Sequence, residues 1–172
     1  MLCDQGESDM REHDMPADAG FFSLDGDATK RLKAMAPDVL VALDVALESF
    51  YDKLESQPDM AALLKETGGS GRLKKAQVEH WRGLLTAGFG EAYRARTVRI
   101  GAAHERIGLD PAHYLGGYLF LAERMFDAVL ARHPFASRAS PEIKALLRAL
   151  LYDVSLSISA YVQKDGLCHS IL

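Results

Sequence analysis

Few polar side chains in this sequence could bind a metal, a cofactor or a ligand and also fall on a predicted apolar helix face. His104 falls on the apolar face of a predicted helix over 91–107, one turn before that helix ends. A single imidazole held there could bind a metal or a cofactor, although a lone histidine on an apolar face is more often a packed core residue. Gly101, one turn earlier, costs the helix about 1 kcal/mol relative to alanine, so we expect something flat or bulky close to that backbone.

Two more polar side chains lie on predicted apolar helix faces. Tyr51 belongs to the buried stripe of a helix that Pro37 opens. A buried phenol needs a partner, which is either a backbone carbonyl in the core or a ligand in a pocket. His80 lies beside the sole tryptophan, Trp81, near the edge of another apolar face, and the simplest interpretation is that both rings cover core surface with their polar ends outward.

Known enzyme motifs are missing, so we expect no catalytic activity. The sequence has no GxxxxGK[ST] loop, no HExxH helix, no nucleophile elbow and no cysteine near an activating histidine. A closed zinc site needs four Cys or His ligands, whereas His80, His104 and His113 come from separate helices without a cysteine among them. One imidazole among apolar helices does fit a haem pocket, and without a CxxCH motif the haem would be held non-covalently.

Composition places the chain among single-domain globular proteins. Its 172 residues, with 48% apolar residue types, are enough for one core. A formal net charge of -4 without a basic run gives no reason to expect nucleic-acid binding. Cys3 and Cys168 lie near opposite ends, where reduced thiols are the simpler interpretation. Without a signal-like leader or a spanning apolar run, we expect a cytoplasmic protein that does not cross a membrane.

The elements that position these side chains are all predicted to be helices. They cover residues 27–35, 37–54, 60–65, 73–85, 91–107, 111–133 and 141–163. Gly108 and the Asp110-Pro111 pair predict a helix end followed by a new start, and Ser140-Pro141 predicts the last start. No strand pattern or internal repeat competes, so the fold class is all-α.

The two ends of the chain differ from its middle. Residues 1–20 lack periodicity and are predicted to be a mobile arm, residues 21–165 to be the folded domain, and residues 166–172 to be a tail.

The last helix has an apolar arc too wide for one contact, which predicts burial on two sides and hence a dimer interface. The residues of that arc are Leu146, Leu147, Leu150, Leu151, Val154, Ile158, Tyr161 and Val162.

Three segments together resemble one protein family. FYDKL at 50–54, HWRGL at 80–84 and IGAAHERIGLDPAHYLGGY at 100–118 resemble the sensor domains of bacterial globin-coupled sensors, in the protoglobin-like branch of the globins. The resemblance runs from about Phe22 to about Tyr161. It implies a globin fold with a short or absent D helix and an N-terminal extension, which dimerises through its last two long helices.

The resemblance also implies roles for individual residues. His104 would be the proximal ligand of iron in a b-type haem, and Tyr51 the distal hydroxyl that hydrogen-bonds bound oxygen. Leu73 matches a distal leucine, and Ala76 stands where some members have a threonine that contacts the ligand. Tyr114 matches the tyrosine beside the proximal histidine. The other residues predicted to line the cofactor are Phe50, Gln77, His80, Trp81, Ile100, Gly101, Ile107 and Tyr118.

The implied function is that of a haem-based gas sensor. O2, CO or NO would bind ferrous haem, and the resulting change would pass through the homodimer formed by the helices over 111–133 and 141–163 to an output domain or a separate signalling partner. Two alternatives stay open. One is a cofactor-free helical dimerisation module, and the other is a globin that handles O2 or NO without a signalling role.

Overall fold

The computed structural model describes residues 18–164, which form six α-helices. They are α1 (Gly26–Glu55), α2 (Pro58–Glu66), α3 (Ser70–Thr86), α4 (Glu91–Arg106), α5 (Pro111–Ala131) and α6 (Ala136–Lys164). No strand occurs in these described residues, which confirms the predicted all-α class. Most of the predicted N-terminal arm and all of the predicted tail over 166–172 lie outside the described residues.

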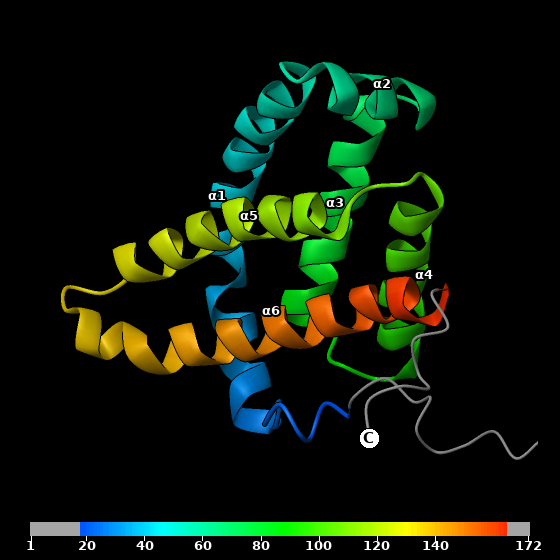
Figure 1. Cartoon of the computed structure of the whole chain (residues 1–172). Helices are drawn as coiled ribbons and strands as arrows, with labels where there is room; N and C mark the ends of the chain where they lie inside the picture. Colours follow the sequence, from blue (N-terminus) through cyan, green and yellow to red (C-terminus); the bar gives the residue numbers. More distant parts are fainter. Residues whose placement is uncertain (1–17, 165–172) are drawn as a thin grey trace, which may run out of the picture.

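The helices form two crossed layers (Figure 1). In one layer α5 and α6 lie side by side, and they cross α1 and α3, which form the other layer. The helix α4 packs on α6, whereas α3 packs on α1, so these two consecutive helices have different main partners. Because α2 ends at Glu66 and α3 begins at Ser70, the chain has no room for another helix between them.

The hydrophobic core lies where the two layers meet. Among its most deeply buried residues are Leu32, Met35, Val39, Leu43 and Leu47 from α1, Met125 and Val129 from α5, and Leu146 and Leu156 from α6. Each is at most 1% exposed, and burial of one such side chain contributes about 1.5–3 kcal/mol. The residues from α1 recur at helical spacing, which is the pattern expected of a core-facing stripe.

One continuous helix, α1, replaces the two that the sequence predicts. The predicted break before Pro37 is wrong, since this proline lies inside α1. Proline removes one backbone hydrogen bond from a helix, but the nearby Met35 and Val39 are both fully buried, and their burial offsets this cost. The helix starts at the Asp25 cap, whose carboxylate accepts a hydrogen bond from the Ala28 N–H at 2.9 Å.

The start of α6 also differs from the prediction. The helix begins at Ala136 and not at Ser140-Pro141, so Pro141 lies within it. The additional turn carries Ala139, which is fully buried. Its burial offsets the cost of a proline near the start of the helix, which the local sequence alone does not reveal.

The turn from α4 to α5 follows the prediction closely. Gly108 adopts a φ of +71°, the left-handed conformation that glycine tolerates, and its N–H donates to the Glu105 carbonyl at 2.9 Å. Asp110 then caps α5 by accepting a hydrogen bond from the Ala112 N–H at 2.7 Å, with Pro111 in the first helical position. This short connection sets the start of α5 beside the end of α4.

The apolar arc of α6 divides between two environments. Leu146, Leu150 and Leu156 are buried in the core, whereas Leu147 and Leu151 are 43% and 50% exposed. The segment Ala136–Val162 is long and apolar enough to cross a membrane by length and composition, with 44% of its most apolar window buried. A core helix with a second apolar face has the same properties, so this is only a weak indication of a membrane span.

Candidate functional site

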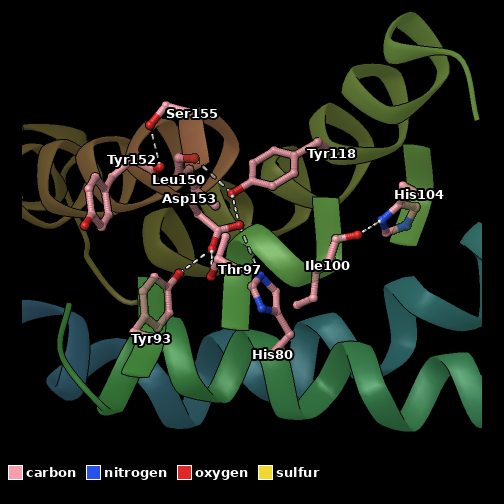
Figure 2. Close-up of polar contacts among 10 residues, drawn as sticks. All are labelled: His80, Tyr93, Thr97, Ile100, His104, Tyr118, Leu150, Tyr152, Asp153 and Ser155. Atoms are coloured by element: carbon pink, nitrogen blue, oxygen red, sulfur yellow. Dashed lines mark hydrogen bonds and ion pairs between the residues drawn. The ribbon is translucent and has the colours of Figure 1, made fainter. Parts of the chain in front are cut away.

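His104 lies in the last turn of α4 with its ring mostly buried. Its Nδ1 is 2.9 Å from the carbonyl oxygen of Ile100, one turn back (Figure 2). When Nδ1 carries the hydrogen and donates it to this carbonyl, the lone pair is on Nε2, which has no hydrogen-bond partner among the described residues. Burial lowers the pKa of His104, only partly opposed by this hydrogen bond, so the ring is neutral near pH 7. A neutral ring with a fixed tautomer is suited to bind a metal.

Tyr114 at the start of α5 lies against His104. The two ring centroids are 5.1 Å apart, with the planes at 61° in an edge-on contact. Tyr114 is 6.1 Å from Tyr118, and Tyr118 is 5.2 Å from Trp81 of α3, again between centroids. A continuous series of aromatic rings therefore connects His104 with α5 and α3.

Tyr51 is a buried phenol whose hydroxyl makes no hydrogen bond to another described residue. It is 3% exposed, and its ring packs edge-on against Phe50 at 5.4 Å between centroids. No backbone carbonyl or other group in the described part of the chain hydrogen-bonds its hydroxyl. Burial raises the pKa of Tyr51 to about 12, so the hydroxyl keeps its proton and can donate it. The interpretation as a core tyrosine bonded to a carbonyl is therefore not supported.

The inner face of α3 carries three buried polar atoms that have no hydrogen-bond partner among residues 18–164. They belong to Gln77 (Oε1), His80 (Nδ1) and Trp81 (Nε1), which lie three and four residues apart and so share one side of the helix. Most buried polar atoms in proteins are paired, so three unpaired atoms on one face suggest a surface that a bound group completes. The sequence predicted that both rings turn their polar ends toward solvent, and this prediction is wrong. Trp81 is only 4% exposed, and His80 turns its Nε2 into the core.

The remaining residues predicted to line the cofactor differ in exposure. Phe50 is buried, Leu73, Ile100 and Ile107 are partly buried, and Ala76 is exposed. The role of each in cofactor binding stays a prediction.

Gly101 lies at a close approach of two helices. A Cβ atom on this residue would be 2.0 Å from the carbonyl oxygen of Ser157 in α6, closer than any real contact. The bulky neighbour that the sequence predicts is thus the backbone of α6. This contact explains the glycine through packing, and its predicted contact with a cofactor is not needed to account for it.

A second buried cluster, centred on Asp153 of α6, was not predicted from the sequence. Asp153 has no exposed surface, and its carboxylate accepts hydrogen bonds from the Tyr93 hydroxyl, the Thr97 hydroxyl at 3.2 Å and the Tyr118 hydroxyl at 3.3 Å (Figure 2). His80 Nε2 lies 3.1 Å from the same carboxylate. The available signal was a lone acid within the apolar arc of the last helix, because a buried carboxylate requires donors from its neighbours.

A groove in the described structure lies away from these residues. It has a volume of about 810 Å³ and lies between α1 and α5, with Val41, Val45 and Phe120 among its lining residues. None of the predicted cofactor residues lines it. The groove is therefore separate from the candidate site around His104.

Comparisons with known proteins place these features in context. The family model described as Protoglobin matches residues 15–166. The haem-based aerotactic transducer HemAT of Halobacterium salinarum is 30% identical over 152 residues, which are 83% of this chain and 31% of the transducer. The chain thus spans about a third of the length of that relative.

A solved structure shows the same fold. The globin domain of a Geobacter sulfurreducens globin-coupled sensor superposes with a TM-score of 0.75 at 18% sequence identity. The superposition covers 83% of this chain and 93% of that domain. This chain and that globin domain therefore share one fold.

Proposed function

Because this chain belongs to the protoglobin family, we propose that it is a gas-sensing haem domain whose physiological ligand is O2. The observation that carries this proposal is the mostly buried His104, whose Nδ1 is 2.9 Å from the Ile100 carbonyl oxygen and whose Nε2 has no hydrogen-bond partner among the described residues. The family and the fold establish a sensor globin with non-covalently bound haem b, and they favour a binding role over an enzymatic one. The choice of gas, the residues of the pocket and the signalling route are our proposals.

The residues present fit the cofactor. When bound, haem would supply an iron atom that can take O2, CO or NO as a ligand. His104 would hold the iron through Nε2, and the Ile100 carbonyl keeps that nitrogen deprotonated and the ring oriented. The unpaired polar atoms of Gln77 and Trp81 on α3 would lie along the same pocket. Leu73 would provide an apolar wall that excludes water.

Tyr51 would give the pocket its preference among gases. Its protonated hydroxyl can donate to O2, which accepts a hydrogen bond better than CO does. Ala76 has no hydroxyl, so Tyr51 is the only hydroxyl donor in the predicted distal set. One neutral hydrogen bond contributes about 0.5–1.5 kcal/mol net, and more in a dry pocket.

Absorption spectroscopy tests the proposal directly. We expect purified, haem-supplemented protein to have a Soret band that moves between nitrogen, CO and O2 atmospheres. A colourless protein would contradict the proposal and would favour a cofactor-free dimerisation module. Steady turnover of NO with a reductase, without any ligand-dependent change in the dimer, would favour a globin that handles gases chemically.

We also propose that the chain forms a homodimer through α5 and α6. The support is an exposed apolar stripe made of Leu115, Leu119, Leu147, Leu151 and Val162, each at least 43% exposed. Such a stripe across two neighbouring helices can pair with its own copy around a two-fold axis. A change in the pocket would then reach an output region or a separate signalling partner through this pair, in the cytoplasm.

The variant Leu151→Glu is expected to weaken this dimer by more than about tenfold. A two-fold interface contains the substituted residue twice, and burial of one leucine contributes about 1.5–3 kcal/mol. Sedimentation measures the dissociation constant, and Val41→Glu is the matched control, since Val41 is 69% exposed on α1 outside the stripe. Equal dissociation constants for the wild type and Leu151→Glu would place the interface elsewhere.

A further inference from the structure

The Asp153 carboxylate is the point where four helices meet. Its Oδ1 accepts from Tyr93 and from Thr97 of α4, and the Thr97 hydroxyl is 3.2 Å away. Its Oδ2 lies 3.1 Å from His80 Nε2 of α3 and 3.3 Å from the Tyr118 hydroxyl of α5. Asp153 itself belongs to α6. Figure 2 shows these side chains converging on it.

The four donors suit an ionised carboxylate. A carboxylate without its proton is an acceptor only, and here each oxygen has two donors. Burial and the neighbouring Asp153 charge raise the pKa values of Tyr93 and Tyr118, so both phenols keep the protons that they donate. Hydrogen bonds to an ionised group are stronger than those between neutral groups, and a helix that moved away from Asp153 would lose one.

Two structural connections run from His104 to this carboxylate. The first is α4 itself, which carries Thr97 two turns before His104. The second is the ring series from His104 to Tyr114 at 5.1 Å and on to Tyr118 at 6.1 Å. The single hydrogen of the Tyr118 hydroxyl is shared between Asp153 at 3.3 Å and the Leu150 carbonyl, which is closer at 2.9 Å. The next residue of α6, Leu151, belongs to the exposed stripe.

We propose that Asp153 is a positioning residue that couples α4 to α6, so that a movement of the helix bearing His104 shifts the helix at the dimer face. This inference rests on the proposed function, because it requires a ligand at His104 and a dimer through α5 and α6. The coupling is carried by defined hydrogen bonds, and removal of one donor weakens it without removing the cofactor ligand.

The test compares two nearly isosteric variants with a matched control. Thr97→Val and Tyr93→Phe each remove one donor to Asp153 and keep the shape of the side chain. Tyr152→Phe is the control, since its buried hydroxyl has no hydrogen-bond partner in the described part of the chain and its ring stacks on Tyr93 at 6.5 Å between centroids. For each protein, sedimentation gives the dimer dissociation constants of the CO-bound and the reduced, gas-free forms, and the Soret band reports the haem.

In the wild type we expect the two dissociation constants to differ by about fivefold or more, a usual allosteric coupling. Both test variants should bring this ratio at least threefold closer to one, with an unchanged Soret band, while the control keeps the wild-type ratio. Variants that unfold at lower temperature but keep the wild-type ratio would show that the cluster is only structural and would overturn the inference. So would a wild-type protein with a Soret band but no dimer or no response to CO. A wild type without a Soret band refutes the proposed function, and this inference with it.

Discussion

His104→Ala is expected to lower the affinity for haem by more than about 100-fold, so that the Soret band of the purified variant is nearly lost. Removal of a group that only orients a metal ligand already costs about 10- to 100-fold in metal affinity, and loss of the ligand itself costs more. No other described histidine combines a buried ring with a free Nε2, because His80 Nε2 faces Asp153. Titration of the apo-protein with haem, followed at the Soret band, measures the effect.

His113→Ala is the control for this experiment. His113 is exposed near the start of α5, so its removal changes the histidine content without reaching the core. Added imidazole should restore a Soret band in His104→Gly, which would separate loss of the ligand from misfolding. Unchanged haem binding in His104→Ala, together with its loss in His80→Ala, would assign the iron to His80 and contradict the proposal.

Local signals in the sequence were sufficient for much of the helical framework. The positive φ of Gly108 and the cap at Asp110 are properties of a few neighbouring residues, and both were predicted. The position of Tyr114 beside His104 follows from this short turn. The sequence prediction failed at Pro37 and Pro141, where it placed helix starts. The cost of a proline inside a helix was offset there by the burial of residues such as Met35 and Ala139.

The polar interior could not be predicted because its partners are distant in the sequence. Asp153 receives donors from three other helices, and no spacing along α6 indicates that His80 or Tyr93 will reach it. The same cluster explains why the His80 ring turns inward. Its position near the edge of an apolar face had suggested that its polar end faces solvent. Gly101 shows a related limit: the sequence predicted a close neighbour, but only packing identified it as the backbone of Ser157.

Tyr51→Phe is expected to speed O2 dissociation by about tenfold and to change CO dissociation much less. The variant keeps the ring and its contact with Phe50 and removes only the hydroxyl, which has no other partner in the described structure. A lost hydrogen bond of about 1.4 kcal/mol corresponds to a factor of ten. Stopped-flow ligand replacement measures both rates, with Tyr152→Phe as a control for loss of a buried hydroxyl elsewhere.

The pH dependence of the Tyr51 effect provides a further check. Burial raises the pKa of Tyr51 to about 12, above its ordinary value, so the phenol stays protonated at any pH well below that value. The ratio of the O2 dissociation rates of Tyr51→Phe and the wild type should therefore be constant between about pH 6 and pH 9. A ratio that falls toward one as the pH rises through this range would mean that the phenol ionises below even the ordinary tyrosine pKa of about 10, which would contradict a protonated donor in a buried pocket. Equal O2 dissociation rates at every pH would mean that Tyr51 serves only packing, and the gas preference would then need another donor.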